Sequence, residues 1–394
     1  MSDPTPDGYA AVAAGLRLAR VQAFSTGPGV ERLLTLDRLA DYVAEDSPYS
    51  RKARFGSEAA ALAWAAGAEM TGLRSGTLAF ADNLPQMHEV CTSAADFRLP
   101  LLMILLSAPP TESGDVCRSH QGGLLARDQA WLQFYPADAQ ELLDLLLIAY
   151  RVAEDPGVLL PAMLCLDAFF LPQGGGPWQG PAPEAAEAFL PPYERHEAVR
   201  GPNGPQVLAP MSHSPDCARR RYWQNRSQGQ ASAALALAMK DFRRVCGRDY
   251  APVESYRCQE AEAVLVMMGS SAGEARRLVD RYRQAGRRVG LLRLLVYRPF
   301  PSSEIAEALE GVEYVGVLDR TACPGYISGP LGTELRSSLS AYGLEARVST
   351  FVAGLAGQEV SETALGRIFD FLLAGHQTRE TLWLDIADEE RPEE

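Results

Sequence analysis

Residues 99–107, LPLLMILLS, form an almost unbroken apolar run. A run of this length without alternation is typical of a strand that is buried on both faces of a parallel sheet. Two further apolar runs lie at 76–81 and 158–167, and helices are expected at 57–71, 86–95 and 138–154. Strands that alternate with helices in this way predict βαβ units and a parallel sheet.

The chain changes character after this first α/β region. Residues 173–215 contain many glycines and prolines, which predict a long connection that wraps over a neighbouring part of the protein. A helix is expected over 227–245, and a second alternation of strands and helices begins near Glu262 with the strand AVLVMM. We therefore expect a first α/β domain, a wrapping connection with a helix, a smaller α/β domain and an acidic tail, at 1–172, 173–255, 256–378 and 379–394.

Composition excludes several classes of protein. The chain has 394 residues, of which 47% are hydrophobic and 22% charged, so a large core can form. A net charge of −13 disfavours nucleic acid as a partner. No apolar run is long enough to span a membrane, and residues 1–10 are polar and acidic rather than signal-like. A cytoplasmic location is expected by elimination.

The seven cysteines are scattered, and no C-x-x-C pair occurs. This spacing predicts neither a disulfide framework nor an iron–sulfur or zinc site within the chain. The sequence also lacks a G-x-S-x-G nucleophile elbow and a Walker A loop. Gly269, which follows a strand, begins either a phosphate-binding turn or a purely structural one. Among the histidines, His120 in RSHQGG is a better pocket candidate than His88.

Glu58 is the acid of greatest interest. It lies in FGSEAAALAWAAGAEMTG, residues 55–72, where Ser57 can cap a helix whose other residues are mostly small. A helix this rich in alanine can approach its neighbours closely and should lie in the core. Two interpretations stay open: Glu58 interacts favourably with the helix dipole, or it directs a carboxylate from a rigid helix into a site.

The same segment belongs to a longer series of stretches that resembles a known family. FADNLPQMHEV at 80–90, FRLPLLMILLSA at 97–108 and the region 127–172 follow it in order, and VLVMMGSSAGEARRLV, VGLLRLLVYRPFP, VGVLDRTACPGYISGPLGTEL and FVAGLAGQEV continue the series from 264 to 360. Together they resemble the alpha subunit of 2-oxoacid:acceptor oxidoreductases of the pyruvate:ferredoxin type. The resemblance implies a pyrimidine-type thiamine-diphosphate-binding domain with a doubly wound parallel sheet, followed by a smaller α/β domain like the transketolase C-terminal domain.

The resemblance also implies cofactors and partners. The family uses thiamine diphosphate, coenzyme A and iron–sulfur clusters to decarboxylate 2-oxoacids oxidatively. This sequence has no Gly-Asp-Gly motif and no cluster-type cysteines. A beta subunit is therefore expected to hold Mg²⁺ and the diphosphate. Gamma and iron–sulfur (delta) subunits complete the expected complex, with 4Fe-4S clusters in partner subunits only and ferredoxin or an NAD-linked acceptor to take up the electrons.

The resemblance assigns a role to Glu58. In the family, a glutamate at the start of the alanine-rich helix hydrogen-bonds a pyrimidine nitrogen of the cofactor and promotes formation of the reactive ylide. Glu58 is the matching residue and thus the expected catalytic residue. Asn83 and Leu84 are the other residues expected beside the cofactor, since 80–84 replaces the Thr-Ser-Ser-Gln-Gly loop of the family.

The substrate side departs from the family pattern. The family commonly has Tyr-Pro-x-Thr-Pro where this chain has residues 24–28, FSTGP, so Gly27 occupies the place of a substrate-facing threonine and Thr26 is adjacent. Ser107 and Ala108 stand where pyruvate-type members carry an arginine that binds the substrate carboxylate. With His120, these residues form the expected substrate pocket.

Small residues in this pocket favour a 2-oxoacid larger than pyruvate, aromatic or branched. Arg54, Arg118 or a partner subunit could bind its carboxylate instead, as could donors from Thr26, Ser107 and Asn83. Two alternatives remain: a non-catalytic structural subunit, which the missing arginine favours, and a thiamine diphosphate half-enzyme without redox partners.

Overall fold

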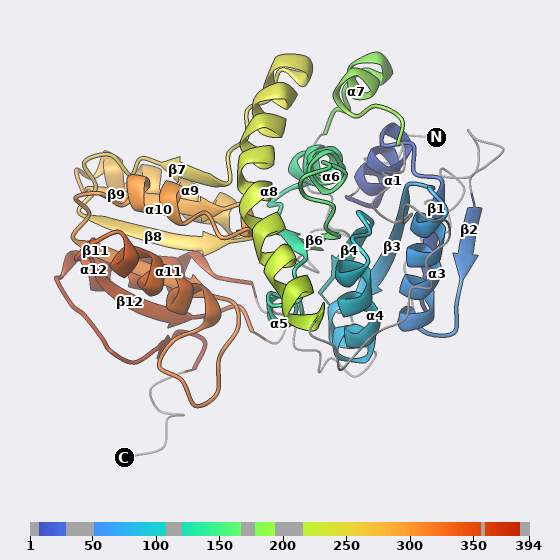
Figure 1. Ribbon diagram of the computed structural model, residues 1–394. Helices are drawn as coiled ribbons and strands as arrows, with labels where there is room; N and C mark the ends of the chain where they lie inside the picture. The colour runs from blue at the N-terminus through green and yellow to red at the C-terminus, as the bar shows by residue number, and fades with distance from the viewer. Residues whose placement is uncertain are drawn as a thin grey trace. The chain divides into compact units, whose positions relative to one another are not determined.

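The computed structural model describes residues 8–28, 51–107, 120–166, 178–193, 216–355 and 359–386. The chain divides into two compact units (Figure 1). Unit 1 comprises residues 1–106, 125–250 and 297–299, and unit 2 comprises residues 107–124, 251–296 and 300–394. The start of the main part of unit 2, Ala251, lies close to the boundary expected at 256, but the short segment 107–124 also belongs to unit 2.

Unit 1 is built on a seven-stranded sheet with the order β10-β5-β6-β4-β3-β1-β2. The strands are β1 (Ala23–Thr26), β2 (Arg51–Arg54), β3 (Ser75–Phe80), β4 (Leu102–Leu106), β5 (Leu132–Phe134), β6 (Ala162–Leu166) and β10 (Val296–Arg298). All neighbouring pairs from β5 to β2 are parallel. Every residue of β3, β4 and β6 is buried, as the apolar runs at 76–81, 99–107 and 158–167 predict.

Helices cover both faces of this sheet. In the part of unit 1 that the structure describes, these helices are α1 (Gly8–Leu18), α3 (Glu58–Met70), α4 (Leu84–Asp96), α6 (Ala139–Ala153), α7 (Pro183–Phe189) and α8 (Asp216–Cys246), and α5 (Gln121–Leu125) crosses the boundary between the units. The chain runs through α3 and α4 in one direction across the sheet and through α6 in the other. Because such crossovers are right-handed, α3 and α4 lie on one face and α6, with α1 packed against it, on the other (Figure 1).

The long helix α8 begins earlier than the sequence indicates. The expected helix starts at 227, whereas α8 starts at Asp216 and has 31 residues. Its buried positions, which include Gln224, Ala231 and Phe242, follow helical spacing. The first part is rich in arginine and carries exposed Tyr222 and Trp223, so it shows little of the apolar periodicity on which the expectation depended.

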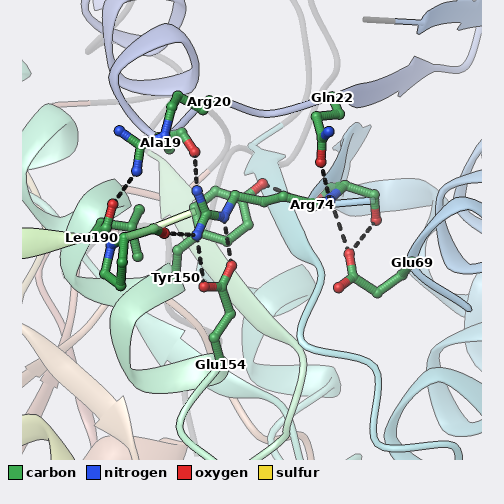
Figure 2. Close-up of polar contacts among 10 residues, drawn as sticks. Ala19, Arg20, Gln22, Glu69, Arg74, Tyr150, Glu154 and Leu190 are labelled. Carbon is green, nitrogen blue, oxygen red and sulfur yellow. Dashed lines mark hydrogen bonds and ion pairs between the residues drawn. The ribbon is translucent and has the colours of Figure 1, made fainter. Parts of the chain in front are cut away.

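A cluster of buried charged groups lies at the amino-terminal edge of the sheet in unit 1. Arg74, only 1% exposed, makes a bidentate ion pair with Glu154 at 2.6 and 2.8 Å and also donates to the carbonyl of Pro191 at 2.8 Å. Figure 2 shows this cluster, in which Glu69 accepts hydrogen bonds from both the N–H and the hydroxyl of Ser75. The cluster therefore ties α6 and the segment after α7 to the first residues of β3.

Unit 2 contains a six-stranded sheet with the order β13-β12-β11-β8-β9-β7. Its strands are β7 (Val253–Tyr256), β8 (Ala263–Met268), β9 (Val289–Leu294), β11 (Tyr314–Asp319), β12 (Arg347–Val352) and β13 (Leu382–Trp383). Its helices are α9 (Ala272–Gln284), α10 (Ser302–Ala308), α11 (Pro330–Ala341) and α12 (Glu362–Leu373). The edge strand β7 pairs with β9 in antiparallel fashion, and the other neighbouring strands described in this sheet are parallel.

Two helices pack together on each side of the second sheet, α9 with α12 and α10 with α11 (Figure 1). A core of aliphatic and aromatic side chains, including Leu265, Val279, Ile368 and Phe369, lies beneath α9 and α12. Within the described ranges, no helix combines the length and the apolar character needed to cross a membrane.

Candidate active site

The carboxyl-terminal edge of the first sheet carries the residues that the sequence singles out. In parallel sheets, the ends of neighbouring strands meet at this edge, and ligands commonly bind there. β1 ends at Thr26 and β3 ends at Phe80, while α3 begins at the same edge with Glu58. The topology thus brings together Thr26, Gly27, Glu58 and the segment after Phe80.

Local sequence explains why α3 begins at Glu58. Ser57 has extended backbone angles, and its hydroxyl accepts a hydrogen bond from the N–H of Ala60 at 3.2 Å. This N-cap places Glu58 in the first turn. Ala61 and Ala65, both completely buried, let the helix pack closely on the sheet, as the alanine-rich sequence predicts.

Glu58 is a buried carboxylate that accepts a hydrogen bond from the backbone. Glu58 is only 4% exposed. The backbone nitrogen of Phe80 donates to its carboxylate and lies 3.1 Å from Oε1 and 3.0 Å from Oε2. Burial raises the pKa of Glu58 to about 7, with a smaller rise from Asp82, while hydrogen bonds from Phe80 and Asn83 act in the opposite direction. A carboxyl group with this pKa can gain or lose a proton near neutral pH.

The segment after β3 surrounds Glu58. Ala81–Asn83 form a short 3₁₀ helix, η2, and α4 follows at Leu84. Asn83 makes no capping hydrogen bond to α4, and its side chain instead contributes a hydrogen bond that lowers the pKa of Glu58. Leu84 is 3% exposed and faces the core. Asn83 therefore lies at Glu58, and whether it or Leu84 contacts a cofactor stays a prediction.

Gly27 lies against the stem of Glu58, and Thr26, the last residue of β1, directly precedes Gly27. The carbonyl of Thr26 accepts a hydrogen bond from the N–H of Phe55 at 3.0 Å, which joins the end of β1 to the residues before α3. A Cβ atom at position 27 would lie 2.9 Å from the Cα of Glu58 and still closer to its Cγ. Glu58 thus fills the space beside Gly27. The sequence-based expectation that Gly27 enlarges the substrate pocket did not take this contact into account.

The other expected pocket residues belong to unit 2 or lie outside the described residues. Ser107 is the first residue of unit 2 and directly follows β4. His120, 6% exposed, donates its backbone N–H to the carbonyl of Arg320 at 3.0 Å, also within unit 2. Ala108 and Arg118 lie outside the described residues. Their common pocket stays a prediction.

Two contributors to the site have no signal in the sequence. The Phe80 group that contacts Glu58 is a backbone N–H, which every residue except proline carries. Asp82 raises the pKa of Glu58 through its charge, and its residue type alone does not identify it in the sequence as a residue of the site. The closest indication in the sequence was the expectation that residues 80–84, which include Phe80 and Asp82, lie beside the cofactor.

No group of three or more potential metal ligands occurs among the residues that the structure describes. The described cysteines take part in no disulfide bond: Cys91, Cys165, Cys217, Cys246, Cys258 and Cys323. At the end of β8, Gly269 adopts a left-handed φ of 81° and leads into α9. That angle explains the glycine structurally and leaves the phosphate interpretation as a hypothesis.

Two family models match the chain. Residues 35–242 match the model "Pyruvate flavodoxin/ferredoxin oxidoreductase, thiamine diP-bdg", and residues 261–365 match "Pyruvate:ferredoxin oxidoreductase core domain II". The first model covers more than half of the chain.

Full-length relatives agree with these models. The pyruvate synthase subunit PorA of Methanothermobacter thermautotrophicus is 31% identical over 379 residues, which cover 96% of this chain and 97% of the relative. The ketoisovalerate oxidoreductase subunit VorA of Pyrococcus horikoshii is 30% identical over 352 residues, covering 89% of this chain and 88% of the relative.

Similar solved structures confirm the fold class. One is a 2-oxoglutarate:ferredoxin oxidoreductase from Magnetococcus marinus with 2-oxoglutarate, coenzyme A and succinyl-CoA bound, with a TM-score of 0.64 and 16% identity. The alignment covers 92% of this chain and 64% of that one. Another is a split gene transketolase, an inactive beta4 tetramer, with a TM-score of 0.55, 12% identity and coverage of 92% and 97%.

Proposed function

Because the chain belongs to the pyruvate:ferredoxin oxidoreductase family, as an alpha subunit of the 2-oxoacid:ferredoxin oxidoreductases, we propose that it forms the part of a thiamine diphosphate site that holds the aminopyrimidine ring. Glu58 is the proposed catalytic residue. The observation that carries the proposal is a buried carboxyl group with a pKa of about 7 at the carboxyl-terminal edge of a parallel sheet. The thiamine diphosphate description of the matching family model supports it.

The environment of Glu58 suits a group that holds and returns a proton. Thiamine diphosphate, when bound, supplies the electron sink for breaking the bond between the carbonyl carbon and the carboxylate of a 2-oxoacid. Glu58 would face a ring nitrogen of that cofactor and exchange a proton with it. Its low exposure keeps water from the carboxyl group, and the Phe80 N–H keeps that group in place.

Other parts of the reaction are assigned to partner subunits. We propose that a beta subunit holds Mg²⁺ and the diphosphate, since this sequence contains no Gly-Asp-Gly motif. Gamma and delta subunits, 4Fe-4S clusters in the partners, coenzyme A, and ferredoxin or an NAD-linked acceptor complete the proposal. The relatives' names describe subunits of larger enzymes, and the solved relative contains coenzyme A, both of which support this division.

Assembly provides the first test. The isolated chain should bind thiamine diphosphate weakly or not at all, whereas the complex co-expressed with beta, gamma and delta subunits should bind it stoichiometrically and show iron–sulfur absorbance. Titration calorimetry and visible spectra measure both. Tight stoichiometric binding by the isolated chain would contradict the proposed division of the site.

Glu58→Gln provides the decisive test. The assembled variant should retain its cofactor but lose turnover by about 10²-fold or more, because the amide cannot exchange the proton. Deuterium exchange at the thiazolium carbon of bound cofactor should slow as well. Glu89→Gln, an exposed acid on α4, is the matched control. Full activity of Glu58→Gln would favour the structural-subunit alternative. Decarboxylation by the wild-type complex without reduction of an artificial acceptor would favour the non-redox half-enzyme.

The proposed substrate is a 2-oxoacid larger than pyruvate, aromatic or branched. Ser107 and Ala108 are smaller than the arginine that the family pattern has there, and a ketoisovalerate enzyme is among the relatives. Gly27 does not enlarge the proposed substrate pocket, because Glu58 fills the space beside it.

A substrate panel tests this choice. The complex should give a higher kcat/KM with 2-oxoisovalerate or phenylpyruvate than with pyruvate or oxaloacetate, measured with an artificial electron acceptor. Ala108→Arg should shift the preference towards pyruvate by restoring a cation for the carboxylate while reducing the space. A wild-type preference for pyruvate over every bulky acid, unchanged in Ala108→Arg, would exclude the larger substrate.

A further inference from the structure

Gly27 and Glu58 approach each other more closely than two residues with side chains could. A Cβ at position 27 would lie 2.9 Å from the Cα and 3.1 Å from the Cβ of Glu58, and closer still to its Cγ. Carbon atoms normally pack at about 3.5–4.0 Å. Gly27 has no left-handed φ, so its backbone conformation is open to other residues. The requirement for glycine here is one of space.

Hydrogen bonds prevent strand and helix from separating to make room. The hydroxyl of Ser25, itself fully buried, donates to the carbonyl of Ala61 in α3 at 2.8 Å. The N–H of Phe55 donates to the carbonyl of Thr26 at 3.0 Å. These contacts join the end of β1 both to Phe55, which precedes α3, and to Ala61 near the start of the helix. A side chain at position 27 would therefore displace Glu58 rather than move the helix as a whole.

Glu58 is thus confined from two sides. Gly27 lies against its stem, and the Phe80 N–H holds both carboxylate oxygens at 3.1 and 3.0 Å. Resting on the function proposed for Glu58, we propose that Gly27 is a positioning residue: its missing side chain sets where the Glu58 carboxyl group stands, and position 27 makes no contact with the substrate. Gly27 acts through Glu58 alone.

This proposal differs from the interpretation of Gly27 as a vacated threonine position that widens the substrate pocket. If the position were vacant, Gly27→Thr would narrow the pocket and shift preference towards smaller 2-oxoacids. If Gly27 positions Glu58, Gly27→Thr and Gly27→Ala lower kcat for every substrate to a similar extent. Displacement of a catalytic group by about 1 Å can reduce a rate about 10²-fold.

The experiment compares Gly27→Ala with Gly56→Ala in the assembled complex. Gly56 lies two residues before Glu58, and a Cβ there meets nothing within 4 Å. Gly27→Ala should lower kcat about 10- to 100-fold with little change in the KM of the 2-oxoacid, while Gly56→Ala stays close to wild type. Hydrogen–deuterium exchange provides a readout that is independent of catalysis: the Phe80 amide should exchange faster in Gly27→Ala only.

A double variant separates this inference from the proposed function. If Gly27 acts through Glu58, Gly27→Ala added to Glu58→Gln causes no further loss of kcat. A fully active Glu58→Gln would refute the proposed function itself. An inactive Glu58→Gln together with a fully active Gly27→Ala and an unchanged Phe80 exchange rate would refute only the role of Gly27.

Failure of Gly27→Ala to assemble is also informative. Glu58→Ala removes the Cγ that lies closest to the new methyl group but keeps the Cα and the Cβ of residue 58, so the Gly27→Ala/Glu58→Ala double variant should assemble in part, better than Gly27→Ala alone. If the double variant assembled no better than Gly27→Ala while Glu58→Ala alone assembled, the Glu58 side chain would not be the group that the new methyl displaces, and the proposed role of Gly27 would be overturned.

Discussion

Glu58 and Glu69 are buried carboxyl groups near opposite ends of the same helix, α3, about 16 Å apart along its axis. Burial raises the pKa of Glu58 to about 7 and that of Glu69 to about 8. Their surroundings nevertheless differ. Glu58 lies at the carboxyl-terminal edge of the sheet, beside the end of β3, whereas Glu69 accepts hydrogen bonds from Ser75 at the start of the same strand. Helix α3 thus connects the candidate active site with the cluster at the amino-terminal edge (Figure 2).

Glu69 should make stability depend on pH. The folded chain keeps the Glu69 proton up to about pH 8, whereas the unfolded chain releases it near 4.5. Raising the pH through this window therefore lowers the free energy of unfolding, by up to about 1.4 kcal/mol per pH unit. Glu69→Gln should flatten the dependence in urea denaturation. The slope between pH 7 and 8 reports on Glu69 most specifically, since Glu58 and Asp319 have pKa values of about 7. An unchanged slope there would contradict the assignment.

The buried ion pair between Arg74 and Glu154 should be sensitive to loss of one partner. Arg74→Met leaves the carboxylate of Glu154 buried without its guanidinium, which should lower the free energy of unfolding by about 3–5 kcal/mol. Arg288→Met, which removes the exposed pair with Glu262, should cost about 1 kcal/mol or less. Urea denaturation of the full chain measures both. Equal effects would mean that burial does not distinguish the two pairs.

Asp319 should stabilise the start of α11. Its carboxylate accepts hydrogen bonds from the N–H groups of Leu331 and Gly332, both at 3.1 Å, and the residue is 1% exposed. Asp319→Ala leaves these donors without their acceptor and should cost about 1–2 kcal/mol. Amide exchange in the first turn of α11 should accelerate. The exposed Glu345→Ala serves as control, and unchanged protection in Asp319→Ala would refute the capping role.

Two glycine substitutions should have opposite effects. Gly67 lies within α3, and a Cβ there meets nothing within 4 Å, so Gly67→Ala should raise stability by up to about 1 kcal/mol. At Gly290 in β9, a Cβ would lie 2.7 Å from the carbonyl oxygen of Arg257 and 2.9 Å from the Cα of Cys258. Gly290→Ala should therefore lower the melting temperature. A higher melting temperature in Gly290→Ala would show that the backbone there can move apart.

Sequence patterns alone located most of the architecture. The apolar runs at 76–81, 99–107 and 158–167 correspond to β3, β4 and β6, because strands buried on both faces consist mostly of apolar residues. Helix α6 begins after its cap Asp138, within the expected range. The early part of α8 was not expected, since a helix face in contact with solvent needs no apolar period.

Local sequence also determined where Glu58 lies on its helix, because Ser57 caps α3 through atoms only three residues apart. Only the tertiary structure decided what surrounds that carboxyl group. The Phe80 N–H comes from a strand 22 residues away, and the space beside Gly27 is closed by the packing of β1 against α3. Backbone donors and close approaches between distant segments are properties of the folded chain, so residue types do not reveal them. The packing of these distant segments nevertheless sets the burial that raises the pKa of Glu58 to about 7, on which the proposed proton exchange depends.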